Sequence, residues 1–370
     1  MVKIDLHCHV IEQKRSVIEF FKECAEQGVE IVAITDHKTL KVFTERIHNL
    51  TPEELKQIPL SIRVVVGIEM TGKYKYTNSA GQTSWIAIDM LGYNIDLSKE
   101  EELNSWIAEN YVDIDSKEFQ SKELNRLIQI AQKMEWQADW EALDIDKDNP
   151  NKCFAGRAIA EALIDEKYRK HNLEKGLAPE IVENTRNFFN FYCKRPEAPF
   201  YLDVTQYFPD IGEVIDILKR CGGMVFVPHI AAYSSKKGDN NEVANAWEDS
   251  QNLAEVFVRE YKGEIHGIEV IHPQNDSPKD EFAEFLYKLA EENGIYVSGG
   301  TDYHQPGETL GKDKKGRPIT NERLPGIENW VKPYTIVEIW EMTNKSKESN
   351  ENSKDQLPEM QPGTNSDKER

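Results

Sequence analysis

The sequence contains no apolar run approaching the roughly 20 residues that a membrane-spanning helix requires. The N-terminus also lacks the basic segment and apolar core of a signal peptide, so we expect a cytoplasmic protein with no membrane partner. The five cysteines are scattered without a Cys-x-x-Cys pair, which indicates neither a disulfide framework nor a thiolate zinc site. There is no glycine-rich phosphate loop, and the Gly299-Gly300 pair is better explained by backbone approaching a crowded site.

Positive charge does not balance negative charge either. Lys and Arg number 45 against 65 Asp and Glu, giving a net charge of −20. This balance argues against broad, nonspecific adhesion to nucleic acid, which needs a basic surface. It leaves room for a small phosphorylated substrate, or for the end of a short RNA or DNA strand, held by a local cationic metal cluster. The sequence does not indicate an oligomeric state.

What the sequence does contain is a recurring unit of helix, glycine, apolar strand and histidine. A capping box at Ser16-x-x-Glu19 starts the first helix, and the apolar run 29–35 that follows it leads to His37. The same order leads through 224–227 to His229, and through 295–298 to His304. Apolar strands that alternate with helices predict parallel pairing and an α/β fold. We predict a barrel of about seven strands.

A long central segment breaks this rhythm. Residues 97–200 contain amphipathic helical patterns, such as the one through Leu124 and Leu127, and no strong strand. We therefore predict a barrel formed by 1–96 and 201–342, with 97–200 as a mainly helical insertion that covers its mouth. Residues 343–370 are almost devoid of apolar side chains and are expected to form a disordered tail.

Histidines and acidic residues gather where the predicted strands end, as active-site residues do in barrels. These candidates are His7, His9, His37, Glu69, Asp89, His229, Asp302 and His304. Imidazole and carboxylate ligands suit Mn²⁺, Fe²⁺ or Zn²⁺, and the set is large enough for two or three divalent ions. Closely spaced ions polarise a phosphoryl oxygen and activate water, so the set indicates hydrolysis of a phosphate ester.

Five motifs, in order along residues 3 to 306, resemble the polymerase and histidinol phosphatase (PHP) superfamily of metallo-phosphoesterases. They are Asp5-Leu6-His7-Cys8-His9, Ile34-Thr35-Asp36-His37, Gly67-Ile68-Glu69, Val227-Pro228-His229 and Gly299-Gly300-Thr301-Asp302-Tyr303-His304. The resemblance implies a distorted seven-stranded β/α barrel with a trinuclear metal site. It assigns His7, His9, Glu69 and Asp302 to one ion, Glu69, Asp89 and His229 to a second, and His37 and His304 to the third.

Within that superfamily, the helical insertion and its Gly156-Arg157 resemble a branch that hydrolyses nucleoside 3′,5′-bisphosphates and trims short RNA from the 5′ end. The resemblance implies that Arg157 faces the phosphate, a task suited to a guanidinium group. Lys194 and Arg195 are further candidates for phosphate binding near the insertion. The histidine that the branch carries after Gly-Arg-Pro is absent, so one phosphate or sugar contact of the branch is missing.

Two further departures concern metal ligands. Asp89 stands where the branch has a histidine before Leu-Gly, and we expect a shift of preference towards Mn²⁺. Glu12 is the only acid near the loop after His9, where the family has Ser-Asp-Gly, and is a candidate ligand of the third ion.

Two residues complete the candidate catalytic set. Asp36 is expected to orient an imidazole rather than to bind metal, and His272 ends a strand and is expected to point into the mouth of the barrel. We predict a metal-dependent phosphoesterase acting on a small nucleotide or on the 5′ end of a short oligonucleotide. Two alternatives stay open, namely a phosphatase for another phosphomonoester such as histidinol phosphate, and a non-hydrolytic module that binds a phosphorylated ligand.

Overall fold

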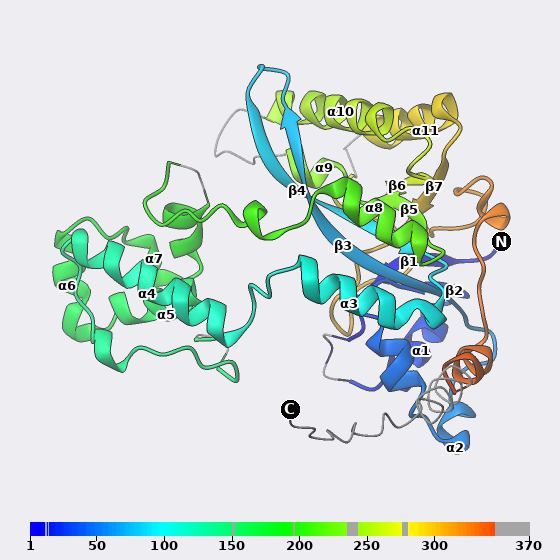
Figure 1. Cartoon of the computed structure of the whole chain (residues 1–370), viewed down its shortest axis with the longest axis horizontal. Coiled ribbons are helices and arrows are strands. Elements are labelled where there is room, and N and C mark those ends of the chain that lie inside the picture. Colours follow the sequence, from blue (N-terminus) through cyan, green and yellow to red (C-terminus); the bar gives the residue numbers. More distant parts are fainter. Residues whose placement is uncertain are drawn as a thin grey trace, which may run out of the picture. The chain divides into compact units, whose positions relative to one another are not determined.

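The computed structural model describes residues 1–11, 13, 15–149, 152–194, 197–234, 243–275 and 280–344 (Figure 1). The predicted site residues Glu12 and Arg195 lie outside the described residues, as do residues 345–370 of the expected tail. The chain divides into two compact units, one formed by Met1–Glu109 with Pro209–Arg370 and the other by Asn110–Phe208. None of the helices in the described ranges combines the length and apolar character that crossing a bilayer requires.

The first unit is a mixed α/β structure built on one seven-stranded sheet whose strands follow each other in chain order. The strands are β1 (Ile4–Cys8), β2 (Ile31–Ile34), β3 (Arg63–Thr77), β4 (Thr83–Tyr93), β5 (Met224–Val227), β6 (Gly267–Ile271) and β7 (Tyr296–Gly299). The sheet nearly closes into a barrel, because Tyr303, just after β7, bridges to Cys8 of β1. The prediction of an α/β structure with a seven-stranded, barrel-shaped sheet is confirmed.

Helices accompany the sheet in the first unit (Figure 1). They are α1 (Val17–Glu26), α2 (Pro52–Leu55), α3 (Glu100–Asn110), α8 (Ile211–Arg220), α9 (Ala231–Ser234), α10 (Val243–Glu260) and α11 (Glu281–Asn293), with the short turns η1 (Val42–Ile47), η2 (Leu97–Lys99) and η6 (Ile327–Asn329), and residues 336–344 are also helical. The predicted capping box starts α1, since Ser16 Oγ accepts the Glu19 N–H and the Glu19 carboxylate accepts the Ser16 N–H. The apolar face of α1 is buried, with Phe20 and Phe21 fully covered.

The prediction of parallel pairing is wrong for β4. β3 does not end near Glu69 but runs on to Thr77, and β4 returns antiparallel beside it from Thr83. The turn between them is tight, because the Asn78 N–H donates to the Gln82 carbonyl and Gly81 adopts φ +79°. So short a connection allows only a hairpin. β4 is antiparallel to β5 too, whereas the other strand pairs are parallel.

The barrel closes at Gly300, where the chain passes directly over β1. A Cβ atom at Gly300 would lie 2.3 Å from the Cβ of His7 and 2.5 Å from its backbone nitrogen, so no side chain fits there. The prediction that this glycine pair marks a close backbone approach at a crowded site is confirmed. The approach brings the segment after β7 against the histidines of β1.

The second unit is helical in its described part. It contains α4 (Lys117–Lys133), α5 (Ala155–Leu163), α6 (Glu166–Glu174) and α7 (Glu180–Glu183), with the short turns η3 (Trp140–Ala142), η4 (Phe189–Cys193) and η5 (Val204–Tyr207). The apolar stripe of α4, which includes Leu124 and Leu127, packs into a core with Trp136 and Phe188. The unit spans 110–208, whereas the insertion was predicted to span 97–200. α3 packs with the first unit, where Thr44 Oγ1 donates to Glu100 at 2.6 Å.

Candidate metal centre

Side chains from six of the seven strands meet at one end of the barrel. His7 lies on β1 and His9 just after it, His37 follows β2, Glu69 lies on β3, His229 follows β5, His272 follows β6, and Asp302 and His304 follow β7. In each parallel strand this is the carboxyl end, where parallel barrels hold their active sites. Of the predicted metal ligands in the described part of the chain, only Asp89 is left out of the three groups that follow.

The carboxylate of Glu69 lies at the centre of this cluster, and its residue is 1% exposed. Its Oε2 atom is 3.3 Å from Nε2 of His7 and 3.3 Å from Nε2 of His9. The same oxygen is 3.2 Å from Nδ1 of His37, and Oε1 is 3.2 Å from Nε2 of His229. Ligand atoms that share one ion with bonds of about 2.1 Å lie about 3.0–3.4 Å apart, so these separations suit ligands of common ions.

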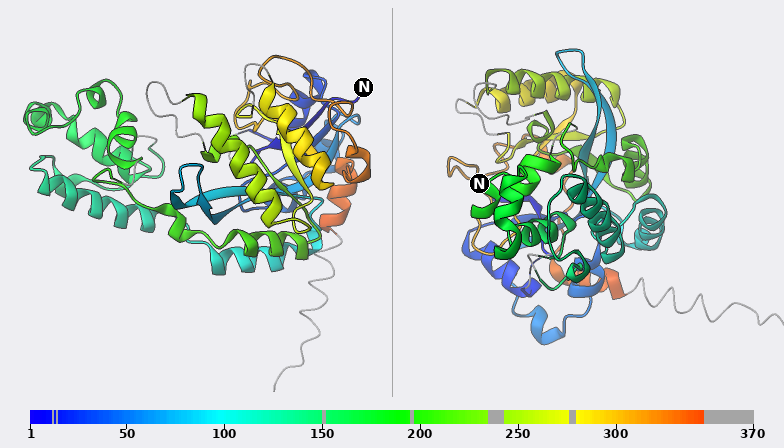
Figure 2. Two further views of the ribbon diagram at one scale, coloured as in Figure 1. Left: turned by 90° about the horizontal axis from the view of Figure 1, so that it is seen from above. Right: turned by 90° about the vertical axis from the view of Figure 1, so that its left-hand side faces the viewer.

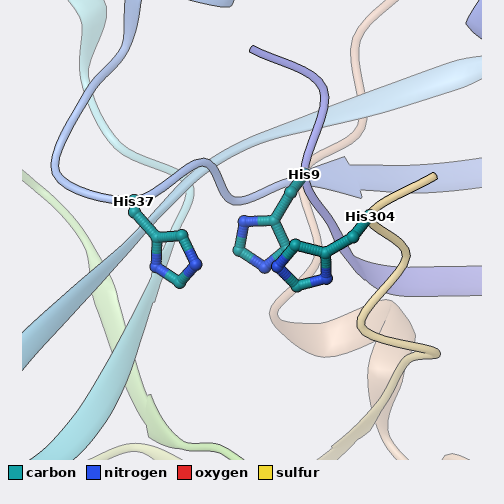
Figure 3. Close-up of side chains that lie close together, drawn as sticks. All are labelled: His9, His37 and His304. Atoms are coloured by element: carbon teal, nitrogen blue, oxygen red, sulfur yellow. The ribbon is translucent and has the colours of Figure 1, made fainter. Parts of the chain in front are cut away.

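Asp302 supplies the second carboxylate. Its Oδ1 atom lies 3.2 Å from Nε2 of His9 and 3.4 Å from Nδ1 of His304. The rings of His37 and His304 both stack on that of His9, with centroid separations of 4.3 and 4.2 Å, and their own centroids are 5.9 Å apart, so the three imidazoles converge (Figure 3). Three groups bring ligand atoms within 4.8 Å of one another, namely His9 with His37 and His304, His7 with Glu69 and His229, and His7 with His272 and Asp302.

The burial of His9 supports a cation at this position. The residue is 0% exposed, and its Nε2 atom faces the carboxylates of Glu69 and Asp302 at 3.3 and 3.2 Å. Two carboxylates this close to one buried point repel each other, and a positive charge between them offsets the repulsion. In the metal-free protein a proton takes this place. Burial opposes the charged ring, but Asp302 and Glu69 outweigh it and raise the pKa of His9 to about 9.

These shifts predict how the stability of the metal-free protein depends on pH. The pKa of His9 is raised from 6.5 to about 9 on folding, so its stabilising effect is complete below pH 6.5 and is lost as the pH rises to about 9. Metal binding requires neutral imidazoles, so the stabilisation by metal grows over the same range.

We therefore expect the melting temperature of the metal-free protein to fall between pH 6.5 and pH 9, and that of the metal-loaded protein to stay higher. Thermal unfolding with and without a chelator measures both curves. In His9→Asn the fall should be smaller, and an unchanged fall in this variant would show that the assignment to His9 is wrong.

Two of the site residues have strained backbones. His229 has φ +26° and Asp302 has φ +56°, values that residues other than glycine rarely adopt. Such strain persists only where the surroundings hold it, and it concentrates at functional sites. The His229 N–H donates to Glu269 at 3.0 Å, which holds the first of these two turns.

Glu269 is a site residue that the sequence reasoning missed. It is fully buried on β6, and its Oε1 atom lies 3.3 Å from Nδ1 of His7. Burial opposes its ionisation, but His272 and His7 outweigh burial and lower the pKa of Glu269, so the carboxylate is charged and accepts the Nδ1 proton. The Nε2 lone pair of His7 then faces Glu69 and is available to a metal. The signal was a lone acid within the otherwise apolar strand 267–271.

His272 has the opposite arrangement. Its Nδ1 atom accepts the backbone N–H of Gln274 at 3.0 Å, so the neutral ring must carry its proton on Nε2. Burial lowers the pKa of His272, which favours this neutral form. The Nε2–H points towards Asp302, whose Oδ2 atom is 3.8 Å away. His272 therefore lies in the cluster, as predicted, with its Nε2 atom facing Asp302 and without a hydrogen-bond partner among the described residues.

Two of the acidic residues predicted for the site, Asp36 and Asp89, form hydrogen bonds with groups outside the cluster. Asp36 Oδ1 accepts the N–H groups of Val10 and Ile11 at 2.6 and 2.8 Å, so it orients the chain that follows His9. Asp89 accepts hydrogen bonds from Thr71 Oγ1 at 2.5 Å and from the Tyr233 hydroxyl at 3.0 Å. Ligation by Asp89 stays a prediction.

The predicted phosphate-binding residues belong to the second unit. Arg157 lines a cavity of about 530 Å³ together with Phe119, Phe154 and Phe189, and its guanidinium lies 5.3 Å from the centroid of the Phe154 ring. Lys194 is exposed. Their contact with phosphate stays a prediction.

Comparison with known proteins supports the fold. No protein-family model and no curated protein matches the sequence. Among solved structures, an amidohydrolase from Chromobacterium violaceum, with bound sulfate and no metal, is similar with a TM-score of 0.52 and 19% sequence identity. The match covers 87% of this chain and 96% of that chain. At this identity the likeness shows the fold.

Proposed function

We propose that this protein is a metal-dependent phosphoesterase of the PHP type. Its substrate would be a small nucleotide, such as a nucleoside 3′,5′-bisphosphate or monophosphate, or the 5′ end of a short oligonucleotide. The observation that carries the proposal is the set of four imidazole nitrogens within 3.2–3.3 Å of the buried Glu69 carboxylate. The sulfate in the similar structure adds support, because sulfate has the shape and charge of a phosphate group.

The proposed ligands are those of the three groups described above, without His272. Two or three divalent ions bound there would polarise the phosphoryl oxygen and lower the pKa of water. The chain itself controls access. His7, His9 and Glu69 are fully covered, whereas the side chains of His37 and His304 are 36% and 34% exposed. Substrate and water therefore approach from the side of His37 and His304.

His272 has a distinct proposed role, the donation of a hydrogen bond from its Nε2–H to a substrate oxygen. Replacement of His272 by Ala is expected to lower kcat/KM about 100-fold with unchanged metal content, because a donor is lost and no ligand is removed. His272→Gln keeps an N–H group near the Nε2 position and should retain most of the activity. Metal analysis beside steady-state kinetics checks both variants. Loss of metal from His272→Ala would show that the ring is a ligand instead.

Amide hydrolysis is a second candidate function. The description of the similar structure as an amidohydrolase favours it, and a metal site of imidazoles and carboxylates can polarise a carbonyl as well as a phosphoryl group.

A substrate panel separates the candidates. The purified protein would be loaded with Mn²⁺, Fe²⁺ or Zn²⁺ and offered adenosine 3′,5′-bisphosphate, a 5′-phosphorylated hexanucleotide, histidinol phosphate and simple amides. We expect metal-dependent phosphate release or 5′ trimming with the nucleotide substrates, and its loss on chelation. Turnover of histidinol phosphate or of amides alone would overturn the nucleotide assignment. Ligand binding without turnover would indicate the non-hydrolytic module.

A further inference from the structure

The β3–β4 hairpin continues outward from the metal centre. Beyond Glu69, β3 extends for eight more residues to Thr77, and β4 pairs with it along this whole length. The end of the hairpin projects past the other strands, beside α10 (Figure 1; Figure 2). The side chains on the same face of the hairpin as Glu69 therefore form a surface that begins at the cluster.

Strand alternation fixes which side chains share the face of Glu69. On β3 they are Thr71, Lys73, Lys75 and Thr77, and the register places Asp89, Ala87, Trp85 and Thr83 of β4 directly opposite them. We call this face the outer ladder. It is the more exposed of the two faces, and Trp85 at its outer part is 46% exposed.

The opposite face of the hairpin is packed, which holds the ladder in place. Tyr74 is buried and its hydroxyl donates to Glu260 of α10 at 2.6 Å. Tyr76 is buried as well, and its hydroxyl donates to the Asp249 carbonyl at 3.2 Å and accepts from Asn252 at 2.8 Å. The outer ladder is thus a preorganised surface, and its side chains are directed away from α10.

The ladder combines cations with an aromatic ring. Lys73 Nζ lies 5.6 Å from the centroid of the Trp85 ring, and Lys75 is the direct cross-strand partner of Trp85. In a chain with a net charge of −20, two lysines beside an exposed indole form a local surface suited to an anion with a flat ring. Single-stranded nucleic acid is bound in this way, by cations along its backbone and by stacking of its bases on aromatic side chains.

Resting on the proposed function, we infer that the outer ladder binds the downstream part of a single-stranded oligonucleotide whose 5′ end lies at the metal centre. Lys75 is six residues from Glu69, so the ladder reaches about 20 Å from the cluster at about 3.3 Å per residue. A single nucleotide is too short to span that distance, whereas a strand of several nucleotides reaches Trp85. The ladder thus assigns an extended, chain-like substrate to this site.

The test compares substrates of two lengths in the metal-loaded full chain. The measured quantity is the ratio of kcat/KM for a 5′-phosphorylated hexanucleotide to kcat/KM for adenosine 3′,5′-bisphosphate. We expect Lys75→Glu and Trp85→Ala each to lower this ratio about tenfold. Lys288→Glu, an equal change of charge on α11, is the control and should leave this ratio unaltered. Asp210 lies 3.7 Å from Lys73, so Asp210→Asn should raise hexanucleotide affinity while keeping a good N-cap for α8.

A binding measurement makes the test independent of turnover. Fluorescence polarisation of a 3′-labelled hexanucleotide, as RNA and as DNA, should show about tenfold weaker binding in both ladder variants, and a shallower salt dependence in Lys75→Glu. Reduced binding of either nucleic acid supports the inference, even if the wild-type protein hydrolyses nothing and the proposed function fails. Unchanged binding, an equal loss for both substrate lengths, or equally tight binding of an acidic peptide would overturn it.

Discussion

Replacement of Glu69 by Gln is expected to lower the turnover of every substrate by about a thousandfold or more, because it removes the charge around which the cluster is assembled. Four imidazole nitrogens lie within 3.3 Å of this carboxylate, and the residue is buried. Gln keeps the volume of the side chain but has only one carbonyl oxygen and no charge. It can neither bridge two ions nor balance them.

The same substitution should also lower the metal content of the purified protein, which elemental analysis measures without any assay of turnover. Glu292→Gln provides a matched control, because it removes an exposed carboxylate on α11 that pairs only at 3.6 Å with Lys288. Circular dichroism shows whether each variant is folded. Full activity in folded Glu69→Gln would show that Glu69 is not part of the metal site.

Replacement of Glu269 by Gln is expected to weaken metal affinity about 10- to 100-fold, the usual cost of losing a partner that orients a metal ligand. One carboxylate oxygen accepts from His7 Nδ1 and the other from the His229 N–H. A Gln side chain offers a single acceptor, so one of these contacts must meet an NH₂ group. Either the ring of His7 or the strained turn at His229 then loses its support.

Glu269 acts through its neighbours, so excess metal should restore kcat in Glu269→Gln. Glu269→Ala, which removes both acceptors, should bind metal more weakly still. Titration of activity against metal concentration distinguishes a loss of metal affinity from a loss of kcat. If kcat stays low at saturating metal, then Glu269 takes part in the reaction directly and is not a positioning residue.

The positions of the histidines could be predicted because the backbone pattern alone determines them. An apolar strand that ends in His37 or His229 must deliver that side chain to the end of the sheet, whatever the details of packing. Gly300 could be interpreted in the same way, since only a close approach explains a glycine pair before Asp302. In these places the local sequence and the fold carry the same information.

The hairpin could not be predicted from the same rule. From Met70 to Thr77 buried and more exposed side chains alternate, as in a half-exposed antiparallel strand, but residues 64–69 read as a buried strand of the parallel type and carried the prediction with them. The role of Glu269 was missed for a different reason. Its meaning lies in two contacts, with His7 and His229, that are distant in sequence and exist only after folding.

Anomalous diffraction from crystals grown with Mn²⁺ tests the central claim most directly, namely that the imidazoles and carboxylates of separate strands surround common ions. The account predicts peaks about 2.0–2.3 Å from the Glu69 carboxylate, between it and the rings of His7, His9 and His229. A well-ordered barrel that binds Mn²⁺ only elsewhere, with these side chains turned away from one another, would contradict it.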